Sequence, residues 1–164
     1  MASYPSRYIN AVMDRVANGT TLFILDQPDL WAQHVMDNLY RHPSVEYLRS
    51  VHWGADGRFI AGESPMFAGL PQSQAMNWEY QVFYRGDIWG IDMNRLGSEV
   101  LVALACENRR DIVTALSRTP FGEGQVFLCT LRIVPELASG TPQSAVAKKL
   151  FLNLLEIPGK TWLK

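Results

Sequence analysis

The stretch from Ser98 to Leu137 constrains the fold of this chain most, because two turn signals divide it into three apolar runs. The first run, Val100 to Cys106, is apolar at every position, which is typical of a strand covered on both faces. The second run is Ile112 to Leu116, and the third is Val126 to Ile133. The letters FGEG at 121–124 separate the second and third runs with two glycines that adopt positive φ without steric cost. The pattern therefore predicts an antiparallel hairpin.

The N-terminal part predicts a helix followed by a strand. Apolar residues recur at helical spacing from Tyr8 to Ala17, with Ser6 as N-cap and Asn18-Gly19 as the exit. Thr20 to Asp26, with the letters TTLFILD, follows as a strand. A helix, a glycine turn and a buried strand make half of a βαβ unit, so the order indicates a parallel sheet with helices on its faces. Such folds normally open with a strand, and we therefore expect the chain to be a piece of a larger protein.

The remaining pattern predicts a helix from Asp29 to Arg41, an irregular segment from Ser44 to Asn94, and a closing helix. Within the irregular segment we expect a short strand around Val45 to Leu48, a loop or single helical turn at Pro65 to Pro71, and a strand at Trp78 to Tyr84. Towards the end we expect a loop over Pro135 to Pro142, a helix over Gln143 to Glu156 capped by Thr141, and a tail at 160–164.

The length of 164 residues fits a single domain with a sizeable core.

Composition excludes several classes of function. Net charge is −1 from 15 basic and 16 acidic residues, so the chain lacks the basic surface expected for binding nucleic acid or an anionic membrane. Its apolar runs are shorter than the roughly 18 to 20 residues that span a bilayer.

Cys106 and Cys129 both lie in apolar runs, where we expect cysteines to be reduced core residues. A disulfide between them stays open if their strands are neighbours.

Residues suited to catalysis are sparse. Neither cysteine sits on a glycine-flanked turn, and the three histidines lack the spacing of a metal site, so we expect no cofactor and no metal. Asp26 is the residue best placed to meet a ligand, because ligands of open α/β sheets collect beyond the carboxyl ends of strands. The same residue could simply turn the chain into the next helix. Carboxylates that could pair for glycosidic chemistry are Asp26, Glu63, Glu79, Asp87 and Asp92, but we expect most of them to be solvated.

Tryptophans in the irregular segment are the second group of candidates. Trp53, Trp78 and Trp89 could stack on sugar rings, since an indole presents an apolar face with a polar edge. Aromatic residues in loops more often belong to satellite cores or anchor an interface. We therefore regard these three residues as candidates for either carbohydrate binding or an interface.

Several local phrases resemble class I glutamine amidotransferase-like domains. The phrase INAVMDRVANGTTLFILDQ (9–27) is similar to their helix–glycine–strand unit, SPMFAGLP (64–71) to one of their loops, and RTPFGEGQVFLCTLRIV (118–134) to their late hairpin. Domains of this kind occur near the C-terminus of bacterial glycoside hydrolases. With HWGADGRF (52–59) and MNWEYQ (76–81), the chain looks closest to the β-galactosidase-like enzymes of family two.

The resemblance implies a flavodoxin-like fold, a three-layer α/β/α sandwich with a mostly parallel sheet and a late antiparallel hairpin. True amidotransferases carry a cysteine at the strand-to-helix elbow and a His-Pro-Glu in a late loop, and this sequence shows neither. In the glycosidases the catalytic carboxylates belong to a separate barrel. The resemblance thus implies a non-catalytic accessory domain whose partner is the catalytic domain of the same polypeptide or a neighbouring subunit, with carbohydrate as a further ligand. A parent enzyme of this kind is expected in the periplasm or outside the cell.

Two alternatives stay open. One is a free-standing carbohydrate-binding module that uses the three tryptophans. The other is a small hydrolase with an active site near Asp26, which would need a second carboxylate or a histidine beside that residue.

Overall fold

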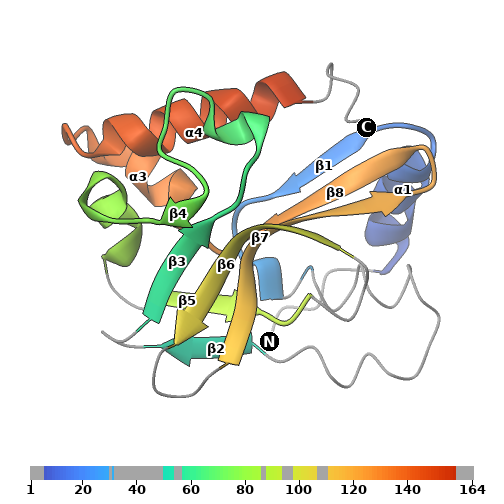
Figure 1. The fold of residues 1–164 in the computed structure, drawn as a ribbon. Helices are drawn as coiled ribbons and strands as arrows, with labels where there is room; N and C mark the ends of the chain where they lie inside the picture. The colour runs from blue at the N-terminus through green and yellow to red at the C-terminus, as the bar shows by residue number, and fades with distance from the viewer. Residues whose placement is uncertain are drawn as a thin grey trace.

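The computed structural model describes residues 6–29, 31, 50–53, 57–85, 88–93, 98–106 and 111–157. These residues form a mixed α/β fold (Figure 1). The strands are β1 (Thr21–Ile24), β2 (Ser50–Trp53), β3 (Gly57–Ala61), β4 (Gln74–Ala75), β5 (Ile88–Ile91), β6 (Glu99–Cys106), β7 (Asp111–Phe121) and β8 (Gly124–Cys129). The helices are α1 (Ser6–Ala17), α3 (Ile133–Ser139), α4 (Ser144–Glu156) and the 3₁₀ turns η2 (Pro65–Phe67) and η3 (Trp78–Tyr84).

The strands form one sheet in the order β1-β8-β7-β6-β3-β4, with β5 joining β7 at Ile91 and Thr114 and β2 joining β5. Among the described pairs, β1 with β8 is parallel and the others are antiparallel. The prediction of a mostly parallel sheet is therefore wrong. Only residues 107–110 separate β6 from β7, and only Gly122 and Glu123 separate β7 from β8. Links this short join antiparallel strands, because a parallel crossover needs a dozen residues or more.

The predicted hairpin is confirmed. Phe121 pairs with Gly124 across the turn, and Gly122 adopts a φ of +59°. Glycine at position 124 is also required for close packing, which the sequence did not reveal. A Cβ on Gly124 would overlap the main-chain oxygen of Val16 in α1. The amide of Glu123 also donates to the main-chain oxygen of Ala17 at 2.9 Å. The turn thus docks on the end of α1, as the right side of Figure 1 shows.

Two apolar clusters lie on opposite faces of β8. Phe127 and Cys129 belong to the larger cluster, which also contains residues of α3, α4, η2 and η3. Val126 and Leu128 alternate with them and belong to the smaller cluster, which contains the apolar face of α1. The three-layer sandwich and the flavodoxin-like topology are not confirmed by this arrangement, although helices do cover both faces of the sheet near β8.

The predicted helices at the two ends are confirmed as α1 and α4, and η2 confirms the single helical turn expected at Pro65 to Pro71. The predicted strand at Trp78 to Tyr84 is wrong, because these residues form η3 and bury Tyr80, Val82 and Phe83. The predicted loop over Pro135 to Pro142 is also wrong, because α3 reaches Ser139. Proline is tolerated in the first helical turn, where its missing N–H costs nothing.

Some expectations fall partly or wholly outside the described residues. They are the helix from Asp29 to Arg41, the strand around Val45 to Leu48, the tail at 160–164 and the side chain of Cys106.

Candidate functional site

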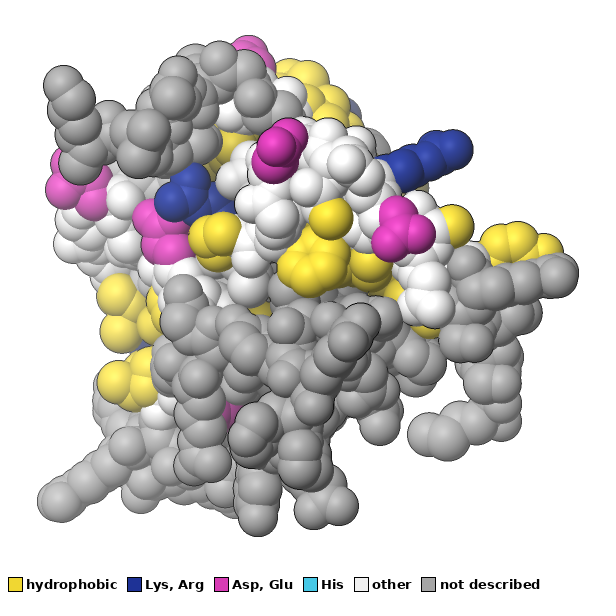
Figure 2. Space-filling model, turned by 90° about the vertical axis from the view of Figure 1, so that its right-hand side faces the viewer, with side chains coloured by type: hydrophobic (Ala, Val, Ile, Leu, Met, Phe, Trp, Pro, Cys, Tyr) yellow, Lys and Arg dark blue, Asp and Glu magenta, His cyan; other side chains and the backbone are white. Residues whose placement is uncertain are grey.

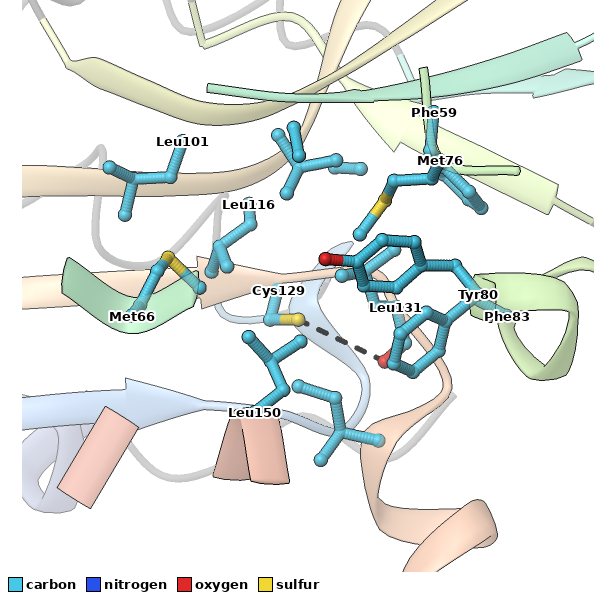
Figure 3. Close-up of a cluster of buried hydrophobic side chains, with 14 of the residues drawn as sticks. Phe59, Met66, Met76, Tyr80, Phe83, Leu101, Leu116, Cys129, Leu131 and Leu150 are labelled. Carbon is cyan, nitrogen blue, oxygen red and sulfur yellow. Dashed lines mark hydrogen bonds between the residues drawn. The ribbon is translucent and has the colours of Figure 1, made fainter. Parts of the chain in front are cut away.

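The larger apolar cluster fills the space between the sheet and α4 with closely packed side chains (Figure 3). The thiol of Cys129 lies inside this cluster, points toward the main-chain oxygen of Leu131 at 3.9 Å, and is free of any disulfide. Burial raises the pKa of the Cys129 thiol to about 12. This cysteine therefore stays protonated and out of reach at neutral pH, as expected for a reduced core residue.

Two tyrosines fix the irregular segment to the core. The hydroxyl of Tyr84 donates to the main-chain oxygen of Met76 at 2.7 Å and accepts from the amide of Phe59 at 2.9 Å. The hydroxyl of Tyr80 donates to the main-chain oxygen of Pro71. Burial, and to a lesser degree the nearby Glu79, raises the pKa of Tyr80 to about 12. These phenols hold backbone groups in place, with Tyr80 buried and Tyr84 half-buried.

Asp26 lies where the sequence suggested, just beyond the carboxyl end of β1, and its side chain is exposed. The next residue, Gln27, has a φ of +46°, so the chain turns sharply before Pro28 and Asp29 begin a helical turn. Among the described residues, no group of three or more histidine, cysteine, aspartate or glutamate side chains could hold a metal ion. The position of Asp26 is therefore that of a turn residue open to solvent.

The structure places the three candidate tryptophans in different environments. Trp78 begins η3 and exposes 75% of its surface. Trp89 lies on β5, is half-buried and packs against the smaller apolar cluster, while its main-chain oxygen accepts a 2.7 Å bond from the hydroxyl of Thr130. Trp53 lies on β2 opposite Ile88, one register step from the pair His52 and Trp89. Of the candidate tryptophans whose side chains are described, Trp78 is open to a ligand and Trp89 is half-buried.

A small hollow lies between the start of β6 and the end of α4. Its lining includes an ion pair in which Arg118 Nε lies 2.7 Å from Glu99 Oε2. The hollow leaves no space for a water molecule. It is too small to be a substrate site.

Sequence reasoning missed one buried charge. Glu136 in α3 is 4% exposed, and its Oε2 lies 3.5 Å from Arg85 Nη1 at the end of η3. The pair joins two elements that were predicted as a loop and a strand. A glutamate beside apolar residues gives no signal of burial until the helix containing it is known. We assign this pair a structural role, because breaking it would leave an uncompensated buried charge.

The charged side chains described on one face of the molecule are of both signs. On the side of the molecule that lies at right in Figure 1, acidic and basic side chains alternate with exposed apolar ones among the described residues (Figure 2). None of the described helices is long and apolar enough to cross a membrane.

A scan of protein-family models and a search of curated proteins gave no match to the chain.

Proposed function

We propose that this chain is a non-catalytic accessory domain of a carbohydrate-active enzyme, a glycoside hydrolase. It packs against the catalytic domain of the same polypeptide or against a neighbouring subunit. The proposal rests on the resemblance of its sequence phrases to the amidotransferase-like domains of such enzymes, together with the way those phrases meet in space.

The observation that supports the proposal best is the joining of the first and last phrases. The strand of the first phrase, β1, pairs in parallel with β8 of the last phrase, Thr21 opposite Gln125 through Ile24 opposite Leu128. Gly124 of the same hairpin lies against the backbone of α1. Segments about 100 residues apart in sequence therefore form one unit, as expected if they belong to one domain type.

The middle phrase joins the same unit from the other face. Its turn, η2, buries Met66 and Phe67, and the side chain of Asn153 in α4 donates to the main-chain oxygens of Met66 and Ala68. We further propose three layers, with α1 below β8 and α4 above it. The two apolar clusters on opposite faces of β8 support this arrangement.

A non-catalytic role agrees with the chemistry of the described residues. Cys129 is enclosed in the core, Asp26 is exposed at a turn, and the described hollow has no room for a substrate. Apolar side chains remain exposed at single positions on several elements. They are Tyr8, Ile60, Trp78, Ile112, Val134, Leu152 and Leu155.

The mass of the native polypeptide tests this proposal. Antibodies against this chain would isolate the polypeptide from its own cells, and mass spectrometry would give its length and sequence. We expect a product much larger than 18.5 kDa that contains a glycosidase barrel. A native product of 18.5 kDa would overturn the proposal and favour a free-standing module.

A second candidate, carbohydrate binding by the chain itself, is favoured by Trp78. Its 75% exposure at the start of η3 is unusual for a tryptophan and leaves the indole face free to stack on a sugar ring.

A further inference from the structure

The 3₁₀ segment η3 presents one edge to solvent. In a 3₁₀ helix side chains three residues apart lie above one another, so η3 has three edges. One edge carries Tyr80 and Phe83, which are buried with their rings 6.3 Å apart (Figure 3). The exposed edge carries Trp78 and Gln81. Three residues of a 3₁₀ helix rise by about 6 Å, so this edge places an indole and an amide roughly one pyranose ring apart.

The backbone that carries Trp78 is fixed on both sides. Before it, the amide of Met76 donates to the main-chain oxygen of Phe59 in β3 at 2.8 Å. After it, the buried Tyr80 donates through its hydroxyl to the main-chain oxygen of Pro71. A site on a rigid backbone loses little conformational entropy when it binds a ligand. The exposed indole is therefore held ready for binding.

The third edge of η3 places a negative charge beside this site. Glu79 lies on it above the buried Val82 and is itself partly buried. Its Oε2 is buried and has no hydrogen-bond partner. The charge of Glu79 acts on its neighbour Tyr80, where it adds to the effect of burial in raising the pKa. A ligand on the adjacent Trp78 lies within the Debye length of about 8 to 10 Å, so Glu79 repels an anion there.

We propose that the exposed edge of η3 binds a neutral saccharide and that Glu79 selects against acidic sugars. The C–H face of a pyranose stacks on the indole of Trp78, and a sugar hydroxyl pairs with the side-chain amide of Gln81. An indole supplies an apolar face, and an amide both donates and accepts hydrogen bonds, as a hydroxyl requires. This inference rests on the carbohydrate-binding candidate of the proposed function, and it names the class of sugar and the residues that select it.

The polar surroundings of Trp78 favour a saccharide over a protein surface. Gln74, Asn77 and Gln81, which are close to it in sequence, are exposed amides. The centre of a protein interface is instead mostly apolar around its aromatic anchors. Quaternary ammonium ligands are held in cages of aromatic rings, and the exposed edge of η3 carries a single indole.

A titration with two matched sugars tests the proposal. Methyl β-galactopyranoside is neutral, and the corresponding methyl galacturonide differs from it by a carboxylate in place of the hydroxymethyl group. Saturation-transfer NMR observes the sugar protons and therefore serves for every variant. We expect the neutral sugar to bind with a Kd on the order of millimolar and the acidic sugar to bind about threefold more weakly or worse.

Four variants separate the roles of the three residues. Trp78→Ala should abolish binding, and Trp78→Phe, which keeps an aromatic face, should retain part of it. Gln81→Ala should weaken binding of the neutral sugar about threefold to tenfold, as expected for one lost hydrogen bond. Glu79→Gln should leave the neutral sugar unchanged and bring the affinity of the acidic sugar to within about twofold of it.

Three outcomes would overturn the proposal. They are no saturation transfer to the neutral sugar, equal binding by the wild type and Trp78→Ala, and the same ratio of the two affinities in the wild type and Glu79→Gln. The first would favour Trp78 as an anchor for a neighbouring domain. The last, with binding at Trp78 retained, would refute the selection by charge and leave the carbohydrate-binding candidate standing. A native product of 18.5 kDa would refute the accessory-domain proposal without changing any result with sugar.

Discussion

The side-chain amide of Asn153 in α4 donates to the main-chain oxygen of Met66 at 2.7 Å and to that of Ala68 at 3.0 Å. Asn153 is 4% exposed; its bond to Met66 is buried, and its bond to Ala68 is partly buried. They satisfy two carbonyl groups at η2 that have no strand to pair with. One helix side chain therefore fixes a loop that lies more than 80 residues earlier in the sequence.

We expect Asn153→Leu, which keeps the side-chain volume and removes the donor, to lower the free energy of unfolding by about 2 to 3 kcal/mol. The cause is the desolvation of two carbonyl groups left without partners. Leu152→Ala, at an exposed neighbouring position of α4, is the control and should cost about 0.5 kcal/mol or less. Urea unfolding measures both, and equal losses would show that the two bonds do not support the loop.

Gly124→Ala should be among the most damaging substitutions of a small residue. Its Cβ would overlap the main-chain oxygens of Val16 and Thr20, so the hairpin must separate from α1. We expect a loss of about 3 kcal/mol or more in unfolding free energy. Gly140→Ala is the matched control, because Gly140 has a φ of +67° but open space around its Cα, and it should cost only about 1 kcal/mol. Similar values for both would exclude the close packing of hairpin and helix.

Stability should fall as the pH rises above about 9. Burial raises the pKa of the Cys129 thiol from 9.0 to about 12, so the unfolded chain loses this proton before the folded chain does. Between these two values the unfolded state binds fewer protons, and the stability that is present below pH 9 is progressively lost. Tyr80 acts in the same direction from about pH 10, because its pKa is raised from 10.0 to about 12.

Urea unfolding from pH 7 to 10.5 measures this effect, and Cys129→Ala provides the comparison. That variant should be less stable at pH 7 because of the lost contacts, but its stability should decline less steeply above pH 9. Parallel declines in the two proteins would mean that Cys129 ionises normally in the folded state.

Two of the candidate tryptophans, Trp78 and Trp89, should respond differently to truncation. Trp78→Ala should change the unfolding free energy by about 0.5 kcal/mol or less, since its side chain is 75% exposed. Trp89→Ala should cost about 2 kcal/mol or more, because Trp89 packs on the smaller cluster. If the chain binds sugar through Trp78, calorimetry with galactose-containing oligosaccharides should show binding that Trp78→Ala abolishes. Binding that survives in this variant would exclude stacking on Trp78.

Local patterns allowed part of the fold to be predicted from the sequence. The 3.6-residue periodicity of α1 and α4 and the glycines at 121–124 each specify one element without reference to the rest of the chain. The parallel sheet was predicted from the helix–glycine–strand order at the N-terminus, and in the structure only β1 with β8 is a parallel pair among the described strands. The apolar run at 100–106 in β6 does not distinguish parallel from antiparallel neighbours. Connection lengths, not composition, contained that information.

The errors at η3 and α3 have a common cause. Both segments contain residues with weak or conflicting propensity, aromatic ones in η3 and Pro135 in α3, and tertiary contacts decide their conformation. The ion pair between Arg85 and Glu136 and the bonds from Asn153 depend on those conformations. Of the candidate site, the position of Asp26 at the end of β1 was predictable, whereas the contrast between exposed Trp78 and half-buried Trp89 required the packed structure.

Hydrolysis of aryl β-galactosides, compared between the native polypeptide and this chain alone, tests the central claim most directly. Both proteins would be assayed at equal molar concentration, and the native polypeptide would be assayed again after Asp26→Ala. We predict activity in the native polypeptide, none in the isolated chain, and no change in kcat for the variant. Hydrolysis by the chain alone that is lost in Asp26→Ala would contradict the account and establish the chain as an enzyme.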